Sequence, residues 1–143
     1  MLRLMVIAIL CGSMLALAGC YEKYHGRVRA TREQLIGVYE TKFDNGTERL
    51  ELKSDGTYVQ EFTSAQKPFR HTGRWLIDDH FLGGTDLELI DAVEYEIAVE
   101  GSIGRVVYNP QQIGTAILNV HKHSEKIALA FNEAFDLYYE RIR

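Results

Sequence analysis

The chain of 143 residues is predicted to be an all-β protein. Its antiparallel strands are expected to form a meander that closes into a small or partly open barrel of about 8–10 strands. Tight-turn signals such as Asn45-Gly46 and Asp55-Gly56 recur at short intervals. The segments between these turns alternate apolar and polar residues with the period of two that strands require. No long helical period follows residue 37, and this favours a barrel or a strongly curved meander.

A single helical turn is expected just before the first strand. Thr31 and Gln34 fit a capping box, and Gly37 follows within one turn. The strand candidates then follow in chain order. They are residues 37–43, 47–53, 57–63, 70–77, 85–90, 94–100, 104–109, 115–122, 126–131 and 136–142.

Residues 1–19 are predicted to be a signal peptide. Met1–Arg3 carries one positive charge, and Leu4–Ala18 is an apolar run. A membrane-spanning helix needs roughly 20 apolar residues, so this run is too short for a permanent span. Its length is that of the hydrophobic region of a signal peptide.

The end of this leader resembles the lipobox of bacterial lipoproteins, which is an apolar residue, two small residues and a cysteine. Here the pattern is Leu17-Ala18-Gly19-Cys20. The resemblance implies that Cys20 is lipidated and that cleavage falls between Gly19 and Cys20. The alternative is an ordinary signal peptide followed by an incidental cysteine. Lipidation of Cys20 and removal of Cys11 with the leader would leave no free thiol, which excludes a thiol-dependent enzyme.

Residues 20–32 are predicted to be the lipidated N-terminus and a tether, and residues 33–143 the barrel domain. The tether is rich in positive charge, with Lys23, Arg27, Arg29 and Arg32 against Glu22 alone. These charges would favour anionic lipid headgroups by about 1 kcal/mol each close to the surface. A merely solvated linker is the alternative.

Residue 21 bears on the destination of the protein. In Gram-negative bacteria an aspartate directly after the lipidated cysteine is the usual signal for retention in the inner membrane, and position 21 is Tyr. We therefore expect sorting to the outer membrane, with the domain facing the periplasm. In a Gram-positive source the anchor would lie in the cell membrane.

Three motifs resemble the lipocalin-like (calycin-type) small domains of bacterial lipoproteins. They are "LIGVYE" at 35–40, "LELKSDGTYVQEF" at 50–62 and "HTGRW" at 71–75. The resemblance implies a barrel that holds a small apolar or amphipathic ligand.

Candidate ligand-binding residues come from two neighbouring strands. Tyr58, Gln60 and Phe62 share one face of the first strand, and His71 and Trp75 share one face of the next. Gln60 and His71 could orient a ligand among the aromatic groups of an apolar pocket. The alternative is that these side chains fill the barrel themselves.

Metal binding and catalysis are not predicted. His121 and His123 lie two residues apart and would need a third ligand such as His71 or His80, so two solvated histidines are expected instead. The acidic residues of 86–100 lack the spacing of a calcium loop and are predicted to form a solvated face. No catalytic motif or cofactor motif is found, so no enzyme is predicted. The net charge of −4 argues against a nucleic-acid partner.

Two functions stay open. The first is a non-enzymatic scaffold or protein-interaction module, anchored in the envelope, that meets a protein partner. An exposed "LYYERI" at 137–142 would suit this function, unless Tyr138 and Tyr139 point to opposite sides of a strand. The second is a tethered binder of a small apolar or amphipathic ligand.

Overall fold

A computed structural model describes residues 25–64, 68–79, 83–99, 104–123, 125–132 and 137–143. For residues 25, 95–99, 104–111 and 132 it describes the backbone alone. The elements are β1 (His25–Arg27), α2 (Arg32–Leu35), β2 (Gly37–Phe43), β3 (Gly46–Leu52), β4 (Thr57–Thr63), β5 (Phe69–Asp79), β6 (Thr85–Val99), β7 (Gly104–His123), β8 (Lys126–Asn132) and β9 (Leu137–Arg141).

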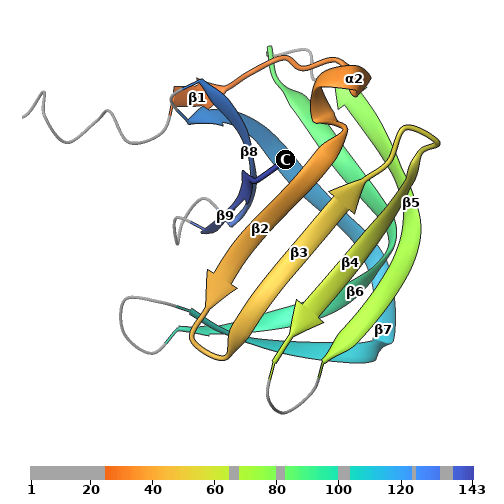
Figure 1. The fold of residues 1–143 in the computed structure, drawn as a ribbon, viewed down its shortest axis with the longest axis vertical. Helices are drawn as coiled ribbons and strands as arrows, with labels where there is room; N and C mark the ends of the chain where they lie inside the picture. Colours follow the sequence, from red (N-terminus) through yellow and green to blue (C-terminus); the bar gives the residue numbers. More distant parts are fainter. Residues whose placement is uncertain (1–24, 65–67, 80–82, 100–103, 124, 133–136) are drawn as a thin grey trace, which may run out of the picture.

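The strands β2 to β9 form a closed antiparallel barrel in which each strand pairs with the next along the chain (Figure 1). The barrel closes where β9 returns to β2, with Tyr39 opposite Arg141 and Glu40 opposite Glu140. The strand β1 is an extra strand that pairs antiparallel with the end of β7. The predicted all-β barrel is therefore confirmed, and it is compatible with a small lipocalin-like domain.

The helical turn and the hairpins agree with the signals in the sequence. The Gln34 side chain accepts a hydrogen bond from the Thr31 N–H at 2.8 Å, which is half of the predicted capping box. Gly56 has a φ of 85°, a conformation that glycine adopts at little cost in a tight turn.

Two pairs of predicted strands are single long strands in the structure. Residues 85–90 and 94–100 were predicted separately, but β6 runs through 85–99, and β7 likewise joins 104–109 to 115–122. The pairing of β6 with β7 is irregular between Leu89 and Ala92 and again between Val93 and Glu94. Such bulges bend strands, and they break the local apolar pattern that a sequence prediction follows.

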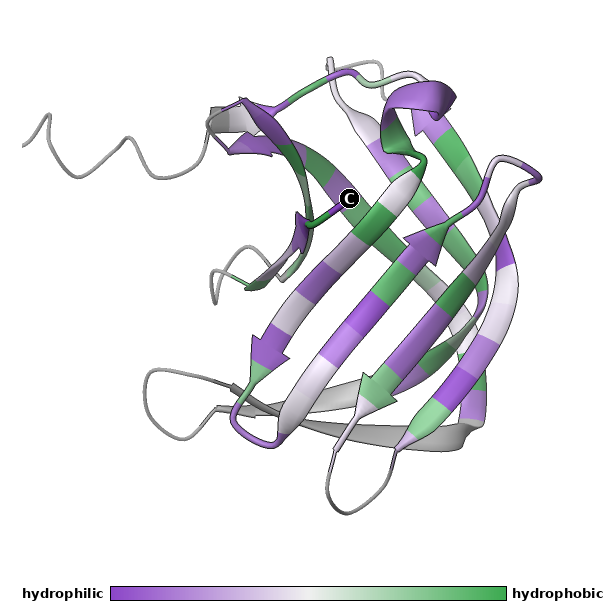
Figure 2. Ribbon diagram, in the orientation of Figure 1, coloured by the Kyte–Doolittle hydropathy of each residue, from purple (hydrophilic) through white to green (hydrophobic). Residues whose placement is uncertain are grey.

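The barrel interior holds two apolar clusters separated along the strands by polar residues. The larger cluster lies toward α2 and contains Leu35, Tyr39, Leu50, Tyr58, Trp75, Leu118, Leu129 and Tyr139, among others. The smaller cluster, Phe43, Phe62 and Leu137 with the partly buried Phe69 and Phe131, lies toward the opposite end. Hydrophobic and hydrophilic residues alternate along β2 to β5, as period-two strands around a core require (Figure 2).

Candidate functional site

The end of the barrel beneath α2 is filled by the chain itself. Leu35 of α2 is fully buried in the larger cluster. The guanidinium carbon of Arg32 lies 4.3 Å from the centre of the Trp75 ring, within the range of a cation–π interaction. The indole N–H of Trp75 donates to the Lys53 carbonyl at 3.0 Å. No ligand is needed to satisfy the polar atom of this tryptophan.

The predicted ligand-binding residues do share the interior face. Tyr58 and Trp75 are fully buried, and Gln60 and Phe62 are almost so. His71 is half-buried, and it is paired in register with Gln60 on the neighbouring strand. The period of two therefore placed these side chains correctly.

The polar groups of these residues bind other parts of the chain. The Tyr58 hydroxyl donates to the Ile90 carbonyl at 3.2 Å. The Gln60 amide donates to Glu48 Oε1 at 2.7 Å and accepts from the Val93 N–H at 3.3 Å. His71 Nε2 contacts the Asp91 carbonyl oxygen. This arrangement favours the alternative in which the side chains fill the barrel.

The β6 bulge supplies two of these acceptors. Asp91 has a φ of 61°, which is uncommon for a residue with a side chain, and it lies inside the first irregularity of β6. The bulge turns the carbonyl groups of Ile90 and Asp91 toward Tyr58 and His71. Burial raises the pKa of Tyr58 above its usual value, and the Asp91 charge raises it further. The phenol of Tyr58 therefore stays neutral through the physiological range.

A buried carboxylate was missed in the sequence. Glu48 has no solvent exposure and lies between the two apolar clusters, where Gln60 binds it. The signal was present, because Glu48 precedes Leu50 and Leu52 at the same period-two positions of β3. Charged residues are rarely buried without a partner, so the residue type gave no reason to expect Glu48 in the interior. Glu48 and Gln60 are thus a buried hydrogen-bonded pair that lies between the two apolar clusters.

A lateral cleft of about 330 Å³ opens in the barrel wall between β7 and β8. β8 pairs with β7 only from Asn119 to His123, so the two strands separate at the residues of β7 that precede Asn119. The lining residues are Ala92, Val93, Glu94, Gly114, Thr115, Ala116, Ile117, Leu118 and Phe131. None of the five predicted ligand-binding residues lines this cleft.

The two histidines of β7 differ in their surroundings. His121 is only 6% exposed and its ring meets the Tyr138 ring edge-on, with centroids 5.5 Å apart. His123 is partly exposed, and its Nδ1 lies 3.8 Å from Glu140 Oε1. The prediction of two solvated histidines is therefore wrong for His121. Among the residues that the structure describes, no group of three His, Cys, Asp or Glu could hold a metal ion.

The C-terminal tyrosines point to opposite sides of β9. Tyr139 is 2% exposed and belongs to the interior cluster, whereas Tyr138 lies against His121. Residues 137–142 therefore do not form the exposed tyrosine surface that would have favoured a protein partner at this end of the chain. His80 lies outside the described residues.

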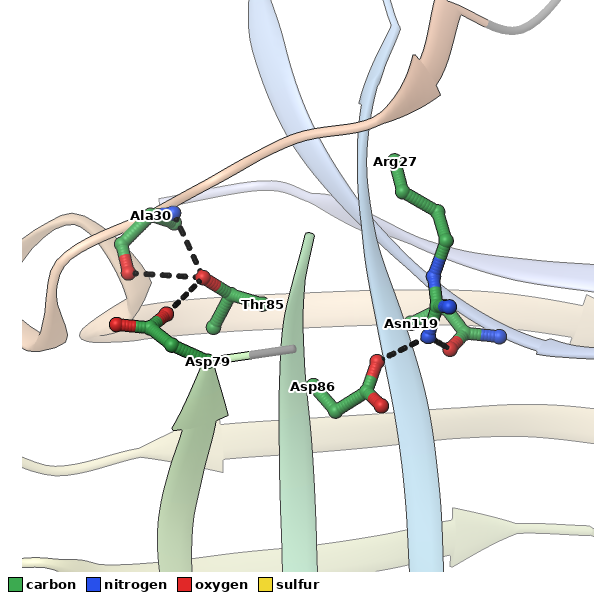
Figure 3. Close-up of polar contacts among 6 residues, drawn as sticks. All are labelled: Arg27, Ala30, Asp79, Thr85, Asp86 and Asn119. Carbon is green, nitrogen blue, oxygen red and sulfur yellow. Dashed lines mark hydrogen bonds and ion pairs between the residues drawn. The ribbon is translucent and has the colours of Figure 1, made fainter. Parts of the chain in front are cut away.

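Part of the predicted tether is attached to the barrel. The β1 strand pairs with β7, and the Arg27 guanidinium binds both Asp86 and Asn119 (Figure 3). Asp86 is 6% exposed, so the predicted solvated acidic face does not include it. Arg27 comes from a segment distant in the sequence, which is why the pairing could not be read from the acidic run itself.

A second contact holds the chain just after β1. The Ala30 N–H donates to Thr85 Oγ1 at 3.1 Å, and the fully buried Thr85 hydroxyl donates to Asp79 Oδ1 at 2.8 Å (Figure 3). Gly19 and Cys20, the predicted cleavage and lipidation residues, lie outside the described residues. In the part that the structure covers, no helix has the length and apolar character needed to cross a membrane.

Comparison with known proteins adds no relative. No protein-family model matches the chain, and no curated protein or solved structure matches it. The likeness to lipocalin-like lipoproteins rests on the sequence motifs, and the barrel agrees with the fold that they imply.

Proposed function

We propose that the protein is a non-enzymatic scaffold or protein-interaction module, anchored by a lipid at Cys20 in the bacterial envelope. The observation that carries the scaffold function is the filled interior. Tyr58, Gln60 and Trp75 are buried, and their polar groups bind the chain itself at distances of 2.7–3.3 Å. A barrel built in this way is a rigid support whose outer surface meets a partner.

The lipid anchor is supported by the lipobox at residues 17–20, and the attachment of β1 to the barrel limits how far the barrel can lie from that anchor. His25 is five positions after Cys20, so the anchor and β1 are at most about 18 Å apart along the extended chain. A barrel attached at this distance stays close to the membrane surface. For a Gram-negative source we propose the outer membrane, with the barrel facing the periplasm, since Tyr21 is not the retention residue.

Cys20→Ser tests the anchor. We expect this variant to keep its leader and to lose lipid-dependent partition into detergent, because the modified sulfur is both the anchor and the signal for cleavage. Detergent phase separation and mass measurement of the processed chain check both effects. Cys11→Ser is the matched control, since it alters a cysteine of the leader and should be processed normally. A Cys20→Ser protein that is cleaved and partitions like the wild type would contradict the anchor.

The lateral cleft favours a second function, the binding of a small apolar or amphipathic ligand. Phe131 provides an aromatic wall, and Ala116 and Gly114 leave room beside it. Pockets of ligand-binding proteins commonly begin near this volume of about 330 Å³.

Phe131→Ala tests the ligand-binding function with the amphipathic dye anilinonaphthalene sulfonate as the probe. If the cleft binds such molecules, this substitution should weaken dye binding about tenfold, which fluorescence titration measures. Phe69→Ala is the control, because Phe69 is also a partly buried member of the smaller cluster but does not line the cleft. Equal binding by wild type and both variants would leave the scaffold as the better description.

A further inference from the structure

The lateral cleft exposes a strand edge that has no pairing partner among the residues that the structure describes. On one side, residues 113–118 of β7 pair with β6. On the other side, β8 pairs with β7 only from Asn119 to His123. Within the described part of the chain no strand pairs with residues 113–118 on that second side. We call this side of residues 113–118 the free edge of β7.

One hydrogen bond shows to which side the backbone groups of each β7 residue point. The Val120 carbonyl accepts from the Val28 N–H, so residue 120 points its backbone groups away from β8. Successive residues of a strand point these groups to alternate sides. Residues 113, 115 and 117 therefore direct their N–H and C=O groups toward the free edge. A row of such groups is a template for pairing with another strand.

The sequence of the free edge lacks two of the features by which proteins usually protect a strand edge, namely charged residues and proline. Its sequence, "IGTAIL", contains no charged residue and no proline. Ile113 is 43% exposed and Ile117 is 58% exposed, and both stand on the outer surface of the barrel beside this edge. Only two other large hydrophobic residues, Leu76 and Ile142, are as exposed among those that the structure describes.

The free edge is complementary to itself. Ile113 and Ile117 lie two residues before and two residues after Thr115. If two copies paired antiparallel about a two-fold axis at Thr115, each Ile113 would lie opposite the partner's Ile117, and the two Thr115 residues would face each other. The residues that point toward the free edge would then form the hydrogen-bonded pairs. Apolar pairs and threonine pairs across strands both stabilise sheets.

We propose that the protein forms a symmetric dimer in which the free edges of two copies pair through residues 113–117 of β7. Such an interface is closed, because both copies use the same edge, and the pairing leaves residues 113–117 of neither copy open to a third. The pairing covers Ile113 and Ile117 and satisfies the backbone groups at 113, 115 and 117. The dimer does not depend on the lipid anchor, so the Cys20→Ser experiment and the experiments below can fail separately.

The first experiment measures self-association of the full chain in excess non-ionic detergent by sedimentation equilibrium. We expect a dimer whose dissociation constant rises at least about tenfold in Ile117→Lys, because a lysine there would face the partner's Ile113. Thr115→Pro should act in the same direction, because its missing N–H is one that points to the free edge and not to β6. Circular dichroism establishes that each variant is folded.

Leu76→Lys is the matched control. Leu76 is 51% exposed and lies on β5, where it pairs with Glu88 of β6 and lies away from the free edge of β7. The proposal requires that Leu76→Lys leave the dissociation constant unchanged. A monomeric wild type at every concentration would overturn the proposal, and so would an equal effect of Leu76→Lys and Ile117→Lys.

The second experiment tests the register. Thr115→Cys places a cysteine at the two-fold axis, where hydrogen-bonded partners have Cα atoms about 5.5 Å apart, within the reach of a disulfide. Mild oxidation should give a covalent dimer on a non-reducing gel, with Leu76→Cys and the wild type as controls. A dimeric Thr115→Cys protein that does not cross-link, or a Leu76→Cys protein that cross-links as readily, would show that the copies meet elsewhere.

Discussion

Replacement of Trp75 by alanine is expected to lower the free energy of unfolding by about 3–5 kcal/mol. Trp75 is fully buried at the α2 end of the barrel, and the substitution removes the largest side chain of the interior cluster. It also leaves the Lys53 carbonyl without the indole donor at 3.0 Å and removes the ring beneath Arg32. The cavity term and the lost hydrogen bond act in the same direction.

Urea unfolding followed by circular dichroism measures this effect, since Trp75 is the only tryptophan and its fluorescence is lost in the variant. Leu76→Ala is the neighbouring control. Leu76 is 51% exposed, so its truncation should change the free energy of unfolding by less than about 0.5 kcal/mol. A Trp75→Ala protein as stable as Leu76→Ala would contradict the packed interior described for this end of the barrel.

Gly73→Ala is expected to destabilise the fold by about 3 kcal/mol, the upper part of the range for overpacking. Gly73 lies opposite Tyr58 in the β4–β5 pairing. A Cβ atom at position 73 would lie 2.6 Å from the Tyr58 ring and would also collide with the Ile90 carbonyl oxygen. The Tyr58 ring lies over Gly73, and its hydroxyl is hydrogen-bonded to the Ile90 carbonyl of the β6 bulge. The ring therefore cannot move away from an added methyl group without losing this hydrogen bond. One added methyl group therefore displaces the hydrogen bond between Tyr58 and Ile90.

Gly26→Ala is the matched control for this substitution. Gly26 also lies in a strand, but a Cβ atom there would meet nothing within 4 Å. Thermal unfolding should show a lower midpoint for Gly73→Ala and little change for Gly26→Ala. Similar midpoints for the two variants would mean that Tyr58 does not lie over Gly73 as described.

The two stability predictions and the dimer concern neighbouring parts of the barrel, which share Ala92 and Leu118. Trp75, Gly73 and Tyr58 belong to the filled region of the barrel. The cleft and the free edge lie where β7 leaves β8, and there the wall is incomplete. The proposed interaction therefore uses the free edge of β7 and leaves the filled region unchanged.

Much of this fold could be predicted from local patterns. The hairpin at Asp55-Gly56, the turn of helix at Thr31 and the inward face of Tyr58, Gln60 and Phe62 depend on interactions between near neighbours in the chain. Each pattern reports a short-range preference, and short-range preferences survive in the folded barrel because the pairing of strands follows their order in the sequence.

Other features could not be predicted because they join segments far apart in the sequence. Arg27 was assigned to a tether, but it binds Asp86, which is 59 residues away. His121 was expected in solvent, but Tyr138 of β9 covers its ring. In both cases the partner lies on a strand whose position depends on closure of the whole barrel.

The sequence by itself determined most of the strands and their order, the inward face of Tyr58, Gln60 and Phe62, and the lipobox-like ending of the leader, since all of these depend on residue type and local spacing. Only the tertiary structure decided that the bulged β6 receives the polar groups of Tyr58 and His71, and that β7 continues past the end of its pairing with β8. The physical reason is that a barrel closed from strands of unequal length contains backbone N–H and C=O groups with no partner strand. The sequence does not show on which strand these groups lie. In this protein residues 113–118 of β7 form one such edge.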